Sequence, residues 1–360
     1  MATISRIGLL TSGGDCAGLN AVIRAVVCRA NGAYGWSVVG IRNGTAGLLA
    51  RPVEAVELDV AMVPATVIRL GGTFLGTTNR GDPFAFPIDG TLVDRSGEVI
   101  EALRMLQIDA FIGIGGDGSL AILRRLAEQG EIGLVGIPKT IDNDLGLTEV
   151  SVGYATAVDV ATEALDRLQP TAASHSRVMV LEVMGRDAGH IALAAGIAGG
   201  ADIILLPEIP YRFSSVADKI ASLKAGGRNF GLVVVAEAVR TESGQPVTTA
   251  QSDGRRTYGG IGQYVGERIG DLTGAETRVT VLGHVQRGGA PSARDRLMAS
   301  IFGAHAVDLI AAGRFDRMVA WRNRQVVDVP IEDAIRNNQA VDPAGPLVRT
   351  ARSLGIYVGE

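Results

Sequence analysis

The fold of this chain follows from one stretch of sequence, Gly133-Leu134-Val135-Gly136-Ile137-Pro138-Lys139-Thr140-Ile141-Asp142-Asn143-Asp144. Its apolar first residues indicate a buried strand, and its last residues form a polar turn at the carboxyl end of that strand. Ligands of open α/β sheets bind at such strand ends. One of the two carboxylates, Asp142 and Asp144, could accept a proton while the other holds a metal or orients its neighbour. An acidic turn without chemistry is the alternative, because Asp and Asn are common turn formers.

The composition limits the class of protein. The chain has 360 residues, which suits two domains of ordinary size. It contains 48 glycines, 47% hydrophobic residues and only 4% aromatic residues, which favours a glycine-turned α/β enzyme over an all-β or disordered chain. The net charge of −4 gives no indication of nucleic-acid binding.

Cysteine usage and hydropathy bear on the compartment. Cys16 and Cys28 provide neither a disulfide framework nor a zinc-binding spacing, so we expect reduced thiols. No apolar run is long enough to span a bilayer, and the N-terminus lacks a secretory signal. We therefore expect a cytoplasmic protein that binds neither membranes nor nucleic acid.

Two further strands are expected to end in glycine-rich turns that lead into helices. A strand over 6–11 precedes the turn 12–18 and a helix over 19–27, and a strand over 110–114 precedes Gly115-Gly116-Asp117-Gly118-Ser119 and a helix over 120–128. Such turns present backbone N–H groups to an anion, and Asp117 can reach a phosphate-bound Mg²⁺. The first of these turns matches neither the P-loop nor the GxGxxG pattern. Tight turns that merely use their glycines are the alternative.

The second half of the chain continues to alternate strands, turns and helices. Strands are expected over 176–183, 203–206 and 232–237 and from residue 278, with helices over 153–168, 191–198, 261–269 and 294–310. Residues 240–257 lack periodicity and are expected to form a surface loop, and residues 318–329 a hairpin. This order indicates βαβ units, and therefore an α/β fold with doubly wound domains and mainly parallel sheets.

Polar residues recur where these strands end. They include the carboxylates Asp117, Asp142 and Glu237 and the cations Arg186 and Arg287. Strand ends meet on one side of a doubly wound sheet. Carboxylates gathered with arginines are what Mg²⁺-assisted phosphoryl transfer between two phosphorylated molecules requires.

Five motifs, in this order, resemble the 6-phosphofructokinase family: Ser12-Gly13-Gly14-Asp15, Gly115-Gly116-Asp117-Gly118-Ser119, Pro138-Lys139-Thr140-Ile141-Asp142-Asn143-Asp144, Met184-Gly185-Arg186 and Leu282-Gly283-His284-Val285-Gln286-Arg287-Gly288-Gly289. The resemblance implies a phosphofructokinase fold with two Rossmann-like domains and a homotetramer. We assign 1–145 with 255–305 to a phosphoryl-donor (nucleotide) domain and 146–254 with 306–360 to a sugar-phosphate domain.

The resemblance also implies a reaction and roles for individual residues. The reaction is the Mg²⁺-dependent transfer of a phosphoryl group from ATP to the 1-hydroxyl of fructose 6-phosphate, a glycolytic step that gives fructose 1,6-bisphosphate. Asp142 resembles the base that takes the hydroxyl proton, and Asp117 the Mg²⁺-linked aspartate. Arg177 and Arg278 resemble arginines that reach the 6-phosphate of a neighbouring subunit. The implied catalytic set is Asp142, Thr140, Arg186 and Asp144. The implied sugar-phosphate set is Arg177, Met184, Gly185, Glu237, Arg278, His284 and Arg287. The implied donor set is Gly14, Arg80, Gly116, Asp117, Gly118, Ser119 and Lys139.

Positions 118 and 139 leave the phosphoryl donor open. In this family, Gly at the first position leaves room for a nucleotide α-phosphate and Asp marks users of pyrophosphate. Lys at the second position is found in pyrophosphate users, whereas many bacterial ATP enzymes have Gly. Gly118 and Lys139 are therefore a mixed pair. We favour ATP, because a carboxylate at 118 would be the element that excludes the nucleotide.

Three alternatives accompany that assignment. The first is a pyrophosphate-dependent fructose 6-phosphate 1-phosphotransferase, and the second is a kinase for another sugar phosphate. The third is a non-catalytic regulatory paralogue, against which the presence of Asp117, Thr140, Asp142 and Arg186 argues.

The effector site implied by the resemblance has lost cations. Arg24 and Arg228 match its arginines, but Cys28 stands where a second arginine is common and Gly226 replaces a basic residue. Fewer cations predict weak or altered control by a nucleoside diphosphate or phosphoenolpyruvate.

Overall fold

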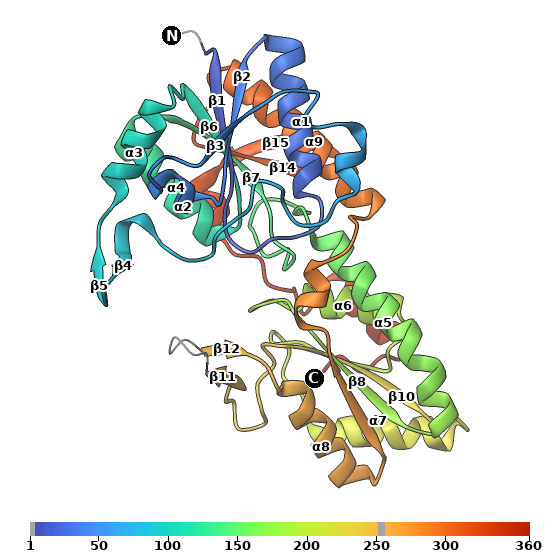
Figure 1. Cartoon of the computed structure of the whole chain (residues 1–360). Coiled ribbons are helices and arrows are strands. Elements are labelled where there is room, and N and C mark those ends of the chain that lie inside the picture. Colours follow the sequence, from blue (N-terminus) through green and yellow to red (C-terminus); the bar gives the residue numbers. More distant parts are fainter. Residues whose placement is uncertain (1–3, 251–255) are drawn as a thin grey trace. The chain divides into compact units, whose positions relative to one another are not determined.

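The computed structural model describes residues 4–250 and 256–360 and contains two sheets with parallel strands (Figure 1). The chain divides into two compact units. Unit 1 comprises Met1–Ile141, Leu145–Ala155 and Arg287–Asn338, and unit 2 comprises Asp142–Asp144, Thr156–Gln286 and Gln339–Glu360.

The C-terminal third of the chain is divided differently from our sequence-based boundaries, which placed 255–305 in the first domain and 306–360 in the second. Residues up to Gln286 belong to unit 2, whose sheet includes β13 (Thr277–Val281). The segment that follows belongs to unit 1, because β14 (Arg317–Arg322) pairs with β7 (Gly133–Pro138). These strand pairings correct the boundaries, and they join residues too distant in sequence for order along the chain to reveal them.

Unit 1 is built on a seven-stranded sheet in the order β15-β14-β7-β6-β1-β2-β3. The inner strands run parallel, whereas β15 and β3 pair antiparallel at the two edges. The remaining strands are β1 (Arg6–Thr11), β2 (Ser37–Ile41), β3 (Ala55–Leu58), β6 (Ala110–Gly115) and β15 (Gln325–Pro330).

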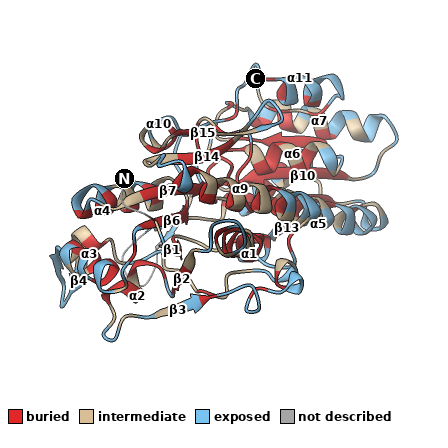
Figure 2. Ribbon diagram, turned by 90° about the horizontal axis from the view of Figure 1, so that it is seen from above, coloured by how far each residue is buried: buried red, intermediate tan, exposed pale blue. Residues whose placement is uncertain are grey.

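The central strands of this sheet are buried almost end to end (Figure 2). Their continuous apolar runs suit parallel strands that are covered on both faces. Phe111 and Leu134 of the sheet pack in one cluster with Leu123 of α4, so the apolar side of that helix faces the strands. The helices of this unit are α1 (Leu19–Arg29), α2 (Thr45–Leu49), α3 (Ser96–Met105), α4 (Asp117–Gly130), α9 (Ala293–Ala311) and α10 (Ile331–Arg336).

Unit 2 has a four-stranded sheet in the order β13-β8-β10-β9, and all its pairings are parallel. Its other strands are β8 (Val178–Val183), β9 (Ile203–Leu205) and β10 (Gly231–Ala236). Its helices are α6 (His190–Ala198), α7 (Phe213–Ala225), α8 (Ile261–Thr273) and α11 (Pro346–Ser353), and α5 (Tyr154–His175) begins in unit 1 and continues into it.

Short elements complete the described chain. β4 (Phe86–Ile88) and β5 (Thr91–Val93) form one small hairpin, and β11 (Thr248–Ala250) pairs with β12 (Arg256–Tyr258). The second pair corrects the expectation of a plain loop over 240–257, whose residues 251–255 lie outside the described part. The short helical turns are η1 (Ala30–Tyr34), η2 (Ala65–Arg69), η3 (Pro83–Ala85) and η4 (Gly283–Arg287).

The expected α/β fold with mainly parallel sheets is confirmed, with one shift that bears on function. Helix α4 begins at Asp117 rather than at residue 120, with Gly116 as its N-cap. An acidic side chain is favoured in the first turn of a helix, where it meets the positive end of the helix dipole. Asp117 therefore belongs to a helix N-terminus rather than to a free loop. No helix in the described ranges has the length and apolar character needed to cross a membrane.

Candidate functional site

The predicted donor residues gather where β1, β6 and β7 of unit 1 end. These three strands are neighbours and run parallel, so their carboxyl ends lie at one edge of the sheet. Hydrogen bonds continue past the strands, from Ser12 N to Ile114 O at 2.9 Å and from Lys139 N to Gly115 O at 3.0 Å. The turns after the three strands are thereby held next to one another.

The turn after β1 has no room for side chains. Gly13 has φ +84°, and a Cβ there would lie 2.9 Å from Ser119 Oγ and 3.3 Å from Lys139 Nζ. A Cβ on Gly14 would lie 3.1 Å from Arg287 Nη1. Two cations therefore lie directly against the turn, which offers backbone amides and positive charge to an anion.

Carbonyl groups of the same turn hold both cations in place. The buried Lys139 ammonium donates a hydrogen bond to Gly14 O, and Arg287 Nη1 donates one to Asp15 O at 3.1 Å. We predicted that Arg287 contacts the sugar phosphate, yet it lies in unit 1 among the donor residues. Its contact with the sugar phosphate stays a prediction.

The N-terminus of α4 forms the second part of this edge. Gly118 is exposed, and a Cβ built on it would meet no atom within 4 Å. Space for a ligand group is therefore available at this position. Backbone N–H groups at a helix N-terminus bind phosphate.

Asp117, in the first turn of α4, suits a magnesium ion that is held mainly by phosphates. Mg²⁺ usually takes one or two carboxylates and completes its shell with substrate phosphates and waters. Within residues 4–250 and 256–360, no group of three or more His, Cys, Asp or Glu side chains could hold a metal ion. A single carboxylate at a helix N-terminus fits a magnesium ion held mainly by phosphates and waters, and not one held by protein ligands alone.

The loop that carries Arg80 is tied to the glycine turn. Gly13 N donates a hydrogen bond to Thr78 O at 2.8 Å, and Thr77 Oγ1 donates one to Gly13 O at 2.7 Å. Thr78 Oγ1 in turn donates to Arg80 O at 2.9 Å. These bonds hold the backbone of Arg80 beside the turn, and Arg80 itself is exposed.

In unit 2, predicted sugar-phosphate residues gather where β8 and β10 end. The two strands are parallel neighbours in which Val183 pairs with Ala236. Glu237 Oε1 accepts hydrogen bonds from Gly185 N at 3.2 Å and from Arg186 N at 2.9 Å. Glu237 therefore shapes the loop that presents Arg186, whose φ is +53°.

The carboxyl group of Glu237 has a raised pKa, chiefly because burial disfavours its charge. The two backbone N–H groups that it binds act in the opposite direction, and the nearby Asp142 raises the pKa further. Its partly buried oxygens are suited to accept hydrogen bonds from sugar hydroxyls.

The stretch with which the sequence analysis began passes from one unit to the other. Thr140 belongs to unit 1, and its carbonyl accepts a hydrogen bond from Ser151 Oγ at 2.7 Å. Asp142 and Asp144 belong to unit 2, and both are buried. The backbone carbonyl of Asp144 accepts a hydrogen bond from Gln339 N at 2.6 Å. Hydrogen bonds therefore hold the motif in each of the two units that it connects.

The predicted sugar-phosphate residues do not all lie together. Arg177 precedes β8 and Arg278 is near the start of β13, so both lie at the amino-terminal edge of the sheet. Met184 and Glu237 follow the carboxyl ends of β8 and β10. A strand of this length places the two edges roughly 20 Å apart. The exposed His284 lies in η4.

Three residues that the sequence analysis did not single out support these groups. Gln286 is buried, and its Oε1 accepts a hydrogen bond from Met184 N at 2.7 Å. Gln339 binds the Asp144 carbonyl, and Glu276 binds Arg177 and Arg278. Gln286 lies inside a quoted motif and could have been proposed, whereas nothing in the sequence near Gln339 or Glu276 marks them.

Comparisons with known proteins identify the family of this chain. A match to the phosphofructokinase family spans residues 6–310. The chain belongs to the phosphofructokinase family. It is 64% identical to ATP-dependent 6-phosphofructokinase 1 of Synechocystis and 62% identical to the protein of that name from Nostoc, with 100% of both chains covered in each case. The predicted family is confirmed.

Solved phosphofructokinase structures share the fold. Pichia pastoris phosphofructokinase in the T-state is 30% identical with a TM-score of 0.78, and the match covers 93% of this chain and 36% of that one. Pyrophosphate-dependent phosphofructokinase from Nitrosospira multiformis has a TM-score of 0.80 at 22% identity, with 99% and 93% covered. The second likeness supports the fold alone, and the predicted phosphofructokinase fold is confirmed.

Proposed function

We propose that this chain is an ATP-dependent 6-phosphofructokinase that transfers a phosphoryl group to the 1-hydroxyl of fructose 6-phosphate. The observation that carries the proposal is the sequence identity of 64% and 62%, over the full length of both chains, with relatives named for this activity. The strand-end residues of both units supply the group types that the reaction needs. A sugar hydroxyl is a poor nucleophile, and the transferring phosphoryl group carries charge that cations must stabilise.

The donor phosphates are assigned to the glycine turn and the start of α4 in unit 1. Gly14, Gly116, Gly118 and Ser119 offer backbone groups, and the Lys139 ammonium and Arg80 supply positive charge. The open space at Gly118 favours a nucleotide, because it leaves room for an α-phosphate. Mg²⁺ held by Asp117 and the phosphates would neutralise charge on the donor.

The sugar phosphate is assigned to residues of unit 2 together with Arg287. Met184, Gly185, Glu237 and His284 would contact the sugar, and Arg177 and Arg278 would bind the 6-phosphate of a neighbouring subunit. Asp142 accepts the proton of the 1-hydroxyl as the new P–O bond forms, and Thr140, Asp144 and Arg186 support it.

Three broader assignments go with this function. We propose unit 1 as the donor domain and unit 2 as the sugar-phosphate domain, with the boundaries that the structure gives. We also propose a homotetramer, as the family resemblance implies, and the contacts assigned to Arg177 and Arg278 need at least a second copy of the chain. We propose a cytoplasmic location, because the reaction is a glycolytic step.

Pyrophosphate is the second candidate donor, and Lys139 is the residue that favours it. Its buried ammonium lies against the glycine turn, where it could bind a departing phosphate. Lys139 excludes no nucleotide, however, whereas an acidic residue at 118 would do so. ATP is therefore preferred.

Turnover assays separate the candidates. Purified protein with fructose 6-phosphate and Mg²⁺ should form fructose 1,6-bisphosphate when ATP is supplied and not when pyrophosphate is supplied. Turnover with pyrophosphate alone would reverse the donor assignment. Absence of turnover with either donor would favour a regulatory paralogue, and turnover only with another sugar phosphate would change the acceptor.

A further inference from the structure

Glu276 joins two arginines at the amino-terminal edge of the sheet in unit 2. Arg177 Nη2 donates a hydrogen bond to Glu276 Oε1 at 2.9 Å, and Arg278 Nη2 donates one to the same oxygen at 2.5 Å. One carboxylate oxygen therefore holds two guanidinium groups side by side. Without it, the two positive charges would lie next to each other with no carboxylate between them.

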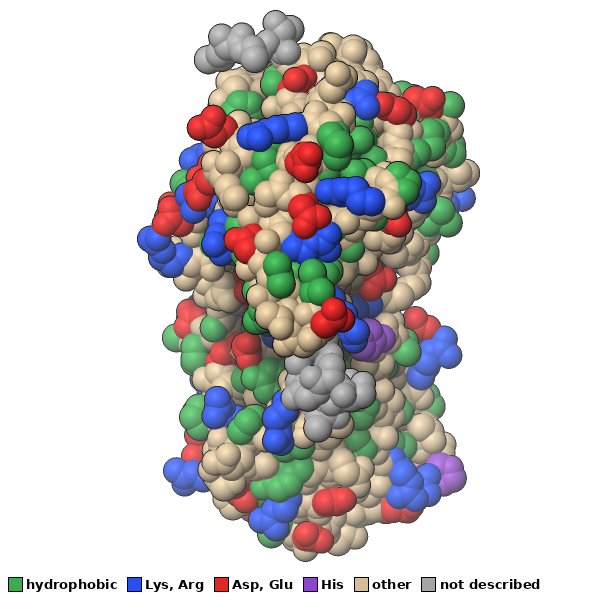
Figure 3. Space-filling view, turned by 60° about the vertical axis from the view of Figure 1, so that its left-hand side comes forward, with side chains coloured by type: hydrophobic (Ala, Val, Ile, Leu, Met, Phe, Trp, Pro, Cys, Tyr) green, Lys and Arg blue, Asp and Glu red, His purple; other side chains and the backbone are tan. Residues whose placement is uncertain are grey.

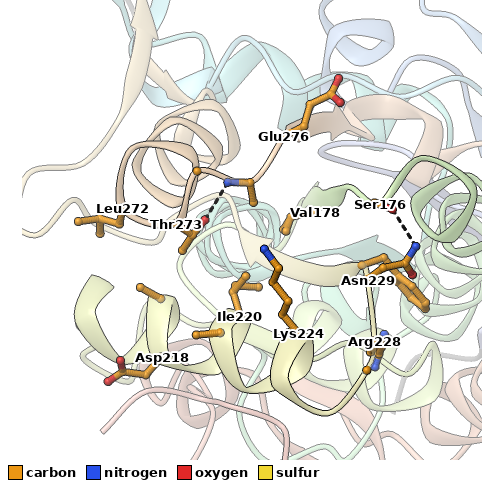
Figure 4. Close-up of a pocket in the computed structure, with 16 residues that line it drawn as sticks. Ser176, Val178, Asp218, Ile220, Lys224, Arg228, Asn229, Leu272, Thr273 and Glu276 are labelled. Carbon is orange, nitrogen blue, oxygen red and sulfur yellow. Dashed lines mark hydrogen bonds between the residues drawn. The ribbon is translucent and has the colours of Figure 1, made fainter.

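The backbone fixes where Glu276 lies. Val178 N donates a hydrogen bond to Glu276 O at 3.0 Å, which places the carboxylate opposite Arg177 across the β8–β13 pair. The turn before it is closed by Gly274, with φ +66°, and by a bond from Ala275 N to Thr273 Oγ1 at 3.2 Å (Figure 4). The position of Glu276 is therefore set before any ligand binds.

A cavity of about 710 Å³ between α7 and the end of α8 also borders Glu276. Figure 4 shows Lys224 extending toward Val178, whereas the carboxylate of Glu276 is directed away from Lys224. Glu276 therefore binds the two arginines and not the ammonium group of Lys224 in the cavity.

The arginine pair is accessible to a ligand. Side-chain exposure is 23% for Arg177, 53% for Arg278 and 49% for Glu276. Arg177 Nε is buried and has no hydrogen-bond partner in the described part of the chain, so a ligand would meet the terminal nitrogens of this guanidinium. Hydrogen bonding with Arg177 lowers the pKa of Glu276, which keeps the carboxylate ionised at neutral pH. Figure 3 shows charged side chains of both signs scattered over one face of the molecule, so mixed charge alone would not mark a site.

We propose that Glu276 is a positioning residue that holds Arg177 and Arg278 together as one phosphate-binding pair for the sugar phosphate. The inference rests on the proposed function, which assigns both arginines to the 6-phosphate. Two long, partly exposed arginine side chains lose rotamer freedom when they bind a phosphate. Glu276 restricts them beforehand and offsets their mutual repulsion, so less ordering is left for the binding step.

Glu276→Gln tests this role, because it keeps the shape and an acceptor oxygen but removes the charge. The dissociation constant for fructose 6-phosphate, measured by calorimetry without a donor, should rise about fivefold or more. KM should rise in parallel while kcat changes little. Glu163→Gln is the matched control, since it removes an exposed ion pair with Arg167 elsewhere in unit 2 and should leave binding unchanged.

A double-mutant cycle separates positioning from general stability. In an Arg278→Ala background, the change at Glu276 should have a much smaller effect on the dissociation constant, because one member of the pair is already gone. An undiminished effect there, or unchanged or tighter binding in Glu276→Gln alone, would overturn the inference. Tighter binding would mean that the carboxylate competes with the phosphate.

The same measurements distinguish this inference from the proposed function. Wild-type protein that binds fructose 6-phosphate but does not turn it over with ATP contradicts the proposed function and leaves the role of Glu276 measurable by binding. Normal turnover with unchanged binding in Glu276→Gln contradicts the inference alone. Wild-type protein that neither binds nor converts fructose 6-phosphate overturns both.

Discussion

The residues at the strand ends of unit 1 and of unit 2 are organised by different parts of the chain, by main-chain groups in unit 1 and by a side chain in unit 2. In unit 1, glycine turns and a helix start present backbone groups, and Lys139 and Arg287 are held by main-chain carbonyls. In unit 2, a side chain shapes the main chain, because Glu237 accepts hydrogen bonds from two backbone N–H groups. Adding a side chain should therefore weaken ligand binding in unit 1, where main-chain groups form the surface. Removing a charge should weaken it in unit 2, where a side chain organises the surface.

Asp142→Asn should have the largest effect, because it removes the proposed base and leaves the shape of both groups intact. We expect kcat to fall about 10³-fold, since an amide cannot accept the proton. KM values should change little, because binding contacts are kept. Steady-state kinetics with each substrate varied would show both, and a near-normal kcat would remove Asp142 from its role.

Gly118→Asp adds a charged side chain to the main-chain surface of unit 1. Since a Cβ at this exposed position meets no atom within 4 Å, the melting temperature should be unchanged. Activity with ATP, as kcat/KM, should fall about a hundredfold through repulsion of the nucleotide phosphates. If ATP is used equally well by this variant, the donor does not pass near the start of α4.

Gly13→Ala adds an uncharged methyl group to the same surface. The methyl group would press on Ser119 Oγ and Lys139 Nζ, and we expect KM for ATP to rise about tenfold, as for the loss of one charge-assisted hydrogen bond. Gly35→Ala is the control, because Gly35 also has positive φ (+68°) but nothing within 4 Å. Both variants should lose about 1 kcal/mol of stability from the left-handed backbone. Equal KM values in the two variants would mean that the Gly13 turn is structural only.

Glu237→Gln removes charge from the group in unit 2. We expect KM for fructose 6-phosphate to rise severalfold, about the effect of one weakened hydrogen bond.

The folded-state pKa of Glu237 is raised above its ordinary value of 4.5, so its stabilising contribution is present below pH 4.5 and is lost as pH rises through the folded-state pKa. The variant should therefore be no less stable than wild type at pH 8, and any advantage should shrink toward pH 4.5. Denaturant unfolding at the two pH values measures this, and a large loss of stability at pH 8 would contradict it.

The smallest expected effect is inhibition by phosphoenolpyruvate. Arg228, one cation that the effector-site resemblance keeps, binds Asp202 at 2.7 Å in unit 2, so part of its charge is already neutralised. With Cys28 and Gly226 at two other positions, we expect weak inhibition in a steady-state assay. Strong inhibition at submillimolar phosphoenolpyruvate would show that the effector site retains enough charge.

Much of the fold could be predicted because strand and helix periods are local properties. The strand over 6–11 and the hairpin near 318–329 were expected where they are found. The errors fall where nonlocal pairing decides. The sequence does not show that β13 joins the sheet of unit 2 while β14 joins that of unit 1, and the β11–β12 pair has no periodicity of its own.

The stretch from Gly133 to Asp144 separates the two kinds of information. Its sequence by itself determined a buried strand with a polar end, because burial of apolar residues and turn preferences act over a few residues. Only the tertiary structure decided that Lys139 binds the Gly14 carbonyl, that Asp144 binds Gln339, and that Arg287 lies with the donor residues. Those contacts join residues far apart in the chain, and parallel strand pairing brings such residues together without leaving a local sequence signal.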